Sequence, residues 1–261
     1  MKVIRRSTWA ALAAASLLAT RLTAQDLAAR VRASDGVVNV VYPSRPSACG
    51  DGRNFIRSVF GSSRGAYYGD VWDSRDAAPC THGPARAAAT VLGGEVTRLR
   101  PYVGPVPTSP PDVRTITATS AEAVAWLSSL ATGTSSRAAP DAIFALVLAD
   151  APDPWPLLLR IARGDDRPRN VRSAALMWLS QGAIDHLGIA DADAHGSDDD
   201  EMRTQAVFVL SQRPKAESVP ELIDLARATK YPAVRKAAIF WLGQTGDRRA
   251  ADVYAELLGI R

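Results

Sequence analysis

Histidine and cysteine are scarce in this chain of 261 residues, which contains three histidines and two cysteines. The histidines His82, His186 and His195 are scattered, and none belongs to a nucleophile-elbow, zinc-protease or phosphate-loop motif. This scatter argues against a conventional hydrolase. We therefore assign no catalytic residue and no cofactor from the sequence.

A basic excess is also absent once the N-terminus is set aside. Residues 1–25 hold four of the 31 basic residues and none of the 27 acidic ones, so the rest of the chain carries 27 of each sign. A protein that binds nucleic acid needs positive charge to neutralise phosphates. The balanced charge therefore argues against a nucleic-acid partner.

The N-terminus resembles an export signal rather than part of a fold. A basic start is followed by an apolar run at residues 9–19 and by a possible cleavage site after Ala24. The apolar run is too short for a membrane anchor. We predict a signal peptide at residues 1–24 and a secreted or periplasmic protein with no stable membrane span after processing. An uncleaved N-terminal anchor is the alternative.

One motif of eleven residues occurs three times in the C-terminal half. Its arginines lie 31 and then 32 residues apart, and an apolar residue, Arg, Ala, Leu and Gln recur at fixed offsets. A period of this size is typical of stacked supersecondary units. The copies are Val171–Gln181, Met202–Gln212 and Val234–Gln244.

The apolar positions of the motif predict one stripe of an amphipathic helix. The residue before the Arg and the residues three, four and seven positions after it are apolar. Their spacings of three and four residues place these side chains on one face of a helix. The residue three positions after the Arg is always alanine, which allows a neighbouring helix to approach closely. We expect the three copies to lie side by side and to bury Ala175, Ala206 and Ala238.

A second, less regular helix precedes at least two of the three motif copies, which predicts units of two helices. A capping box at Thr119 and Glu122 opens a degenerate first repeat. The later repeats are expected at residues 150–181, 183–212 and 219–244. We expect a short first helix around 183–189 in the third repeat, a first helix from 219 in the fourth, and a final helix at 250–258 that covers the end.

These copies resemble HEAT repeats of the short type first described in phycobilisome lyases. The resemblance implies a mainly α fold, an α-solenoid with a right-handed superhelix of about four repeats plus a C-terminal cap helix at residues 119–261. It also implies a binding scaffold rather than an enzyme, since most such repeats bind proteins. We therefore expect an exported scaffold for a protein or peptide of the cell envelope. A bilin-lyase-type enzyme and a calcium-responsive envelope protein are the alternatives.

A small β-rich module is expected at residues 25–104, followed by a Pro-rich linker at residues 105–118. The module has a β-branched segment at 36–43 and a Gly-Gly hairpin signal at 93–94. In an exported protein its Cys49 and Cys80 are expected to form a disulfide, which such a small module needs. A metal site with His82 and free thiols are the other interpretations.

Two rows of motif residues are candidates for partner binding. Second helices of such repeats usually line the concave face, where aromatic side chains can hold a partner segment. Burial in the core between repeats is the alternative for this row. The aromatic candidates are Trp178, Phe208 and Trp241.

The other row consists of arginines near helix N-termini, where a positive charge is mildly unfavourable. The resemblance implies an Asp–Arg ladder between repeats, with Asp165 or Asp166 and residues 198–200 as partners. A ligand-binding row is the alternative. The arginines are Arg172, Arg203 and Arg235.

An acidic run at residues 191–201 is a weak candidate for calcium binding. Asp191 and Asp193 occupy the first and third positions of a calcium loop, but the twelfth position is Met202 instead of a bidentate glutamate. The alternative is a solvated loop whose carboxylates favour the N-terminus of the following helix.

Overall fold

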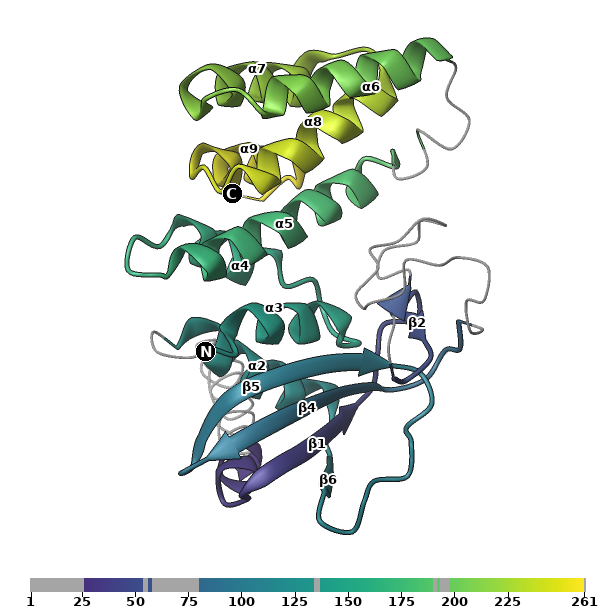
Figure 1. Ribbon diagram of the computed structural model, residues 1–261, viewed down its shortest axis with the longest axis vertical. Helices are drawn as coiled ribbons and strands as arrows, with labels where there is room; N and C mark the ends of the chain where they lie inside the picture. The colour runs from purple at the N-terminus through teal and green to yellow at the C-terminus, as the bar shows by residue number, and fades with distance from the viewer. Residues whose placement is uncertain are drawn as a thin grey trace, which may run out of the picture.

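The structure is a computed structural model that describes residues 26–53, 56–57, 80–133, 137–189, 192 and 198–260. The predicted signal peptide, Asp191 and Asp193 lie outside these residues. A small sheet at one end carries a stack of helices (Figure 1). This arrangement confirms the prediction of a mainly helical repeat solenoid that follows a small N-terminal β-module.

Four strands form a mixed sheet in the order β5-β4-β1-β6. β1 is antiparallel to β4 and parallel to β6, and β4 is antiparallel to β5. The Gly93-Gly94 hairpin is confirmed, since both residues have positive φ, 58° and 78°, as a two-residue primed turn requires. The strands are β1 (Gly36–Tyr42), β4 (Ala85–Leu92), β5 (Glu95–Val103) and β6 (Arg114–Thr117).

β6 lies within the segment that we predicted as a linker. Its sequence, Arg-Thr-Ile-Thr, is rich in β-branched residues, and Ile116 is buried where the strand pairs with β1. The prolines before it do not prevent this pairing, because they precede the strand. Residues 114–117 are therefore an edge strand, and the division of the chain into domains stays a prediction.

The predicted disulfide between Cys49 and Cys80 is present, with a Cα–Cα distance of 5.2 Å. It lies beside a two-stranded ribbon of β2 (Cys49–Gly50) and β3 (Ile56–Arg57), and Gly50 also bridges to Thr81. The disulfide joins residues 31 positions apart. A loop of that length contributes about 3–4 kcal/mol by restricting the unfolded chain.

Helices α2 (Ser120–Thr132) and α3 (Ala139–Leu148) cover one face of the sheet (Figure 1). The capping box at Thr119 and Glu122 is confirmed, because each residue's side chain binds the other's backbone N–H. The hydroxyl of Tyr42 in β1 donates a hydrogen bond to the carbonyl of Ala145 in α3, at 2.8 Å. The sheet and the first helices therefore share one hydrophobic core.

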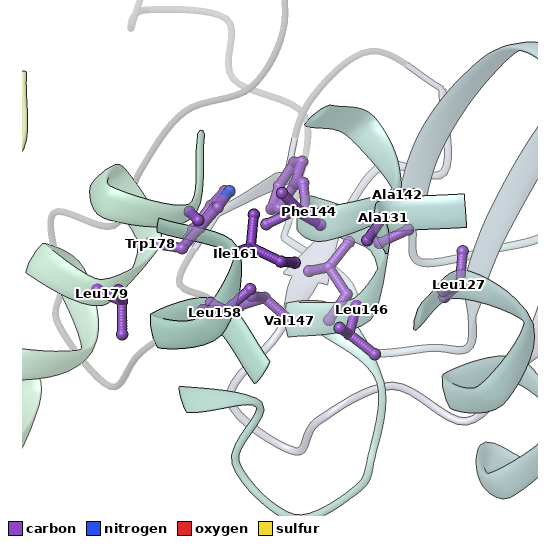
Figure 2. Close-up of a cluster of buried hydrophobic side chains, with 14 of the residues drawn as sticks. Leu127, Ala131, Ala142, Phe144, Leu146, Val147, Leu158, Ile161, Trp178 and Leu179 are labelled. Carbon is purple, nitrogen blue, oxygen red and sulfur yellow. The ribbon is translucent and has the colours of Figure 1, made fainter. Parts of the chain in front are cut away.

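The remaining helices stack beyond α3 (Figure 1). The helices are α4 (Trp155–Arg163), α5 (Arg169–His186), α6 (Asp198–Ser211), α7 (Lys215–Ala228), α8 (Pro232–Gln244) and α9 (Arg249–Leu257). α4 is packed against α5, and α7 is packed against α8. Figure 2 shows the first junction, where Phe144 and Val147 of α3 meet Leu158, Ile161 and Trp178. All five side chains are buried, so the core continues from the sheet into the stack.

The three motif helices lie side by side, but not in chain order. α5 packs against α8, and α8 packs against α6. A Cβ built on Gly243 of α8 would lie 3.1 Å from the Cβ of Ser180, and one on Gly246 would lie 3.0 Å from the Oγ of Ser173. From Gly243 to Gly246, which follows the end of α8, the residue numbers rise, whereas those of the contacted serines fall from 180 to 173. α5 and α8 are therefore antiparallel.

Ion pairs support the same order, in which the α8–α9 pair lies between the α4–α5 pair and the α6–α7 pair (Figure 1). Arg163 of α4 lies 2.9 Å from Asp252 of α9. Arg227 of α7 lies 2.7 Å from Glu256 of the same helix. α9 therefore contacts both neighbouring pairs, and the α6–α7 pair forms the far end of the stack.

Two predicted helix boundaries are wrong. The short helix expected around 183–189 is the C-terminal part of α5, which continues without a break to His186. Gly188, with φ of 64°, then ends the segment. α7 begins at Lys215 instead of 219 and contains Pro220 as its sixth residue, where proline cannot donate the usual backbone hydrogen bond to the carbonyl of Ala216.

Candidate functional site

The aromatic row predicted from the motif divides into a core residue and a surface pair. Trp178 is only 3% exposed, and its ring stacks on Phe144 with centroids 4.4 Å apart. Figure 2 shows both rings inside the cluster between α3 and α5. Partner binding by Trp178 is therefore a wrong prediction, because the α3 layer covers the side chain. The alternative, burial between repeats, holds at this position.

Phe208 and Trp241, by contrast, lie together on α6 and α8. Their ring centroids are 5.1 Å apart, and Phe240 packs edge-on against Trp241 at 5.0 Å. Phe208 is 36% exposed and Trp241 is half-buried. The structure therefore brings these two predicted contact residues together at the far end of the stack, where they remain accessible.

Among the residues that the structure describes, the predicted arginine row does not form a ladder between repeats. Arg203 binds Asp200 at 3.0 Å and Asp199 at 3.3 Å within its own helix, and its guanidinium lies 4.4 Å above the ring of Tyr231. Arg235 donates a hydrogen bond from Nε to the carbonyl of Ala226 at 2.8 Å.

The aspartates expected to partner Arg172 have other partners. Asp165 pairs with Arg248 in the loop before α9, and Asp166 pairs with Arg167. Arg172 is half-buried at the start of α5. The ladder prediction is wrong because the α8–α9 pair occupies the place next to α4 and α5, so its side chains meet these carboxylates.

An open groove of about 770 Å³ runs along α6. Its apolar walls come from Ala206 and Leu210 of α6, Leu225 of α7, and Tyr231 and Val234 at the start of α8. Arg203, Arg213 and Glu221 supply charge at its edges. The groove therefore combines apolar walls with mixed charge, as protein-binding surfaces commonly do.

The outer side of α6 beside the groove is exposed although it carries the core stripe of the motif. Met202 is 69% exposed, Val209 is 56% exposed, and Ala206 is also exposed. The prediction that Ala206 is buried is therefore wrong, whereas Ala175 and Ala238 are buried as predicted. We call Met202, Ala206, Val209 and the adjoining groove the α6 face.

The sister copies show what the α6 face lacks. At the positions of Met202 and Ala206, α5 has Val171 and Ala175, which are 1% and 0% exposed. The same positions in α8 are 5% and 0% exposed. In α5 they are covered by the α3 and α4 layers and in α8 by its neighbours, whereas α6 ends the stack.

Sequence reasoning missed Met202 and Val209 as contact residues. The α6 copy has Met202 where its sister copies have Val, and Val209 where they have Trp, but these positions are apolar in all three copies, so they gave no signal of exposure. Only the order of the stack determines which copy remains uncovered, and that order depends on contacts between distant segments.

Metal binding finds no support in the described part of the chain. Within those residues, no group of three or more His, Cys, Asp or Glu side chains could hold a metal ion. His82 has its Nδ1 3.1 Å from the carbonyl of Ala48, beside the disulfide. Asp191 and Asp193 lie outside the described residues, so the calcium prediction stays a prediction.

Comparison with known proteins identifies the helices at the far end of the stack. A family model for HEAT repeats matches residues 192–259, which contain α6 to α9. Neither the search of curated proteins nor that of solved structures found a match. Among the described residues, no helix is long and apolar enough to span a membrane.

Proposed function

Because this chain carries HEAT repeats, we propose that it is a non-enzymatic scaffold for protein–protein interaction and that the α6 face is its contact surface. HEAT repeats are typically binding scaffolds that use surfaces extending over several helices. The observation that carries the proposal is the exposure of Met202, Ala206 and the adjoining groove on α6. The matching positions of α5 and α8 are buried.

Covering this face would release substantial free energy. Met202 and Val209 are each more than half exposed. Full burial of a completely exposed side chain of this kind contributes about 1.5–3 kcal/mol, which is the upper bound for each of these partly covered residues. Phe208 and Trp241 form a separate aromatic pair between α6 and α8, and neither residue lines the groove. A partner that covers Met202, Val209 and the groove therefore gains apolar contact area on α6.

Export to the cell envelope or the medium is part of the same proposal. The apolar N-terminal segment with its basic start motivates it. The disulfide between Cys49 and Cys80 supports it, since such bonds persist mainly in oxidising compartments. Cell fractionation and N-terminal sequencing test it, and a mature protein that begins near Gln25 is expected. An intact N-terminus in the cytosol would contradict export.

Site-specific photo-crosslinking in cells tests the contact surface. A photoreactive amino acid at Val209 is expected to give a covalent adduct with another polypeptide chain. The control is Leu92 at the tip of the β4–β5 hairpin, an apolar residue that is 58% exposed, close to the 56% of Val209. Adducts of the same yield at both positions, or at neither, would contradict a contact surface on α6.

A further inference from the structure

The α6 face has opposite charges at its two ends. Asp199, Ala206 and Arg213 are each seven residues apart, which is about two helical turns, so they share one side of the helix. Arg213 follows the last helical residue, yet it lines the same groove as Ala206. The apolar side chains of Met202 and Val209 lie between the two charges.

The charges at these ends are available for a contact. The side chain of Asp199 is 67% exposed and is held by Arg203 at 3.3 Å. Arg213 is exposed, and within the described residues its side chain forms no hydrogen bond or ion pair. Asp200 and Glu201 add negative charge to the first end, and Lys215 adds positive charge to the second.

We propose that a second copy of this chain covers the α6 face, antiparallel to the first and related to it by a two-fold axis near Ala206. This inference rests on the proposed function and names the partner at the same surface. The two-fold axis brings Asp199 of each copy against the partner's Arg213, and this contact occurs twice. A parallel arrangement would instead place like charges together, which is unfavourable.

The shape of the face fits this arrangement. The same axis places Met202, which protrudes, beside the partner's Leu210 on the wall of the groove. Methionine is flexible and fills irregular apolar space well. The small Ala206 lies at the axis, where the two helices must come closest. Each copy therefore presents a projecting side chain and a groove to receive it, as an isologous contact requires.

Packing within the chain shows that the motif can pair with itself in this direction. α5 and α8 carry two copies of the motif, and they pack against each other in antiparallel orientation through Ser180 and Gly243. The α6–α6 contact between two chains would use the third copy in the same antiparallel manner. The motif position differs, because Ser180 and Gly243 correspond to Ser211 of α6, whereas the α6–α6 contact would centre on Ala206.

The test is sedimentation velocity of the purified full chain over a wide range of concentration. The mass is expected to rise from one chain to two. Asp199→Arg and Arg213→Asp are each expected to weaken dimerisation roughly ten-fold or more, because each places two pairs of like charges in the interface. Asp224→Arg is the control, since it makes the same change at an exposed position of α7 outside the groove.

An equal mixture of the two charge variants makes the test specific. In a mixed dimer the new arginine of one chain faces the new aspartate of the other, and native Asp199 faces native Arg213 at the second contact. The mixture is therefore expected to dimerise more tightly than either variant alone. This recovery cannot come from unfolded protein, and thermal melts of each variant check its fold.

Two results would overturn the inference: a wild-type chain that stays monomeric, or a dimer that neither charge variant weakens. Crosslinking at Val209 separates this failure from failure of the proposed function. A monomeric chain that crosslinks at Val209 to a different protein keeps the scaffold and excludes the second copy. A monomeric chain with no adduct at Val209 rejects both.

Discussion

A disulfide engineered between α5 and α8 would test the order of the helical stack directly. Ser180 and Gly243 occupy the same motif position in the two helices, and a Cβ on Gly243 would lie 3.1 Å from the Cβ of Ser180. Disulfides have Cβ–Cβ distances of about 3.5–4.5 Å. The helices need to separate by only a few tenths of an ångström, so the S180C/G243C variant is expected to form the bond.

The size of the effect follows from the separation of the two residues, which lie at positions 180 and 243. Closing a loop of this length restricts the unfolded chain by about 4 kcal/mol, less any strain in the folded state. The assay is peptide mapping by mass spectrometry without reduction, which separates the new bond from the native Cys49–Cys80 bond. Thermal melts with and without reductant then measure the gain in stability.

The matched control is S180C/S211C, because Ser211 holds the equivalent motif position in α6. If the helices were stacked in chain order, α6 would be the neighbour of α5 and this second pair would crosslink. In the observed order α8 separates the two helices, so no bond is expected between positions 180 and 211. Formation of the 180–211 bond in place of the 180–243 bond would refute the order described here.

Three further predictions concern the core, a helix terminus and the β-module. Trp178→Ala should lower the free energy of unfolding by about 3–5 kcal/mol, because the side chain is buried. Val209→Ala, at the equivalent but exposed motif position, should lower it by well under 1 kcal/mol, and chemical denaturation measures both values. Thr119→Ala should cost about 0.5–2 kcal/mol at neutral pH. The hydrogen bonds from Thr119 lower the pKa of Glu122. The stabilisation by the capping box is therefore present above the ordinary carboxyl pKa and is lost as the pH falls through the lowered pKa. Equal dependence of stability on pH in wild type and Thr119→Ala would contradict this. Cys49→Ser should cost about 2–5 kcal/mol in thermal or denaturant melts, and an unchanged melting temperature would show that the bond does not stabilise the fold.

Local features of the fold were predictable from the sequence because each depends on neighbouring residues. The capping box needs only Thr119 and Glu122, and the β4–β5 hairpin needs only two adjacent glycines between strand-like segments. The repeat period similarly identified the three motif helices. The disulfide was predicted from a count of two cysteines together with the expectation of export.

The order of the stack was not predictable, for a physical reason that lies in the repeat itself. Each motif helix carries the same apolar stripe and the same small alanine, so any copy can pack on any other at similar local cost. The choice of neighbour depends on single contacts between distant residues. The close approach of Gly243 to Ser180 is one such contact between α5 and α8, and the exposed ion pair of Asp252 with Arg163 accompanies this order.

The contact surface on α6 is a direct consequence of that order. In a stack that followed the chain, α6 would lie between α5 and α8, and both sides of its stripe would be covered. Because α8 takes the inner place, α6 becomes the terminal motif helix, and Met202 and Val209 remain exposed. The 180–243 disulfide and the dimer are therefore linked predictions: a chain that forms the 180–211 bond instead should also bury Val209 and remain monomeric.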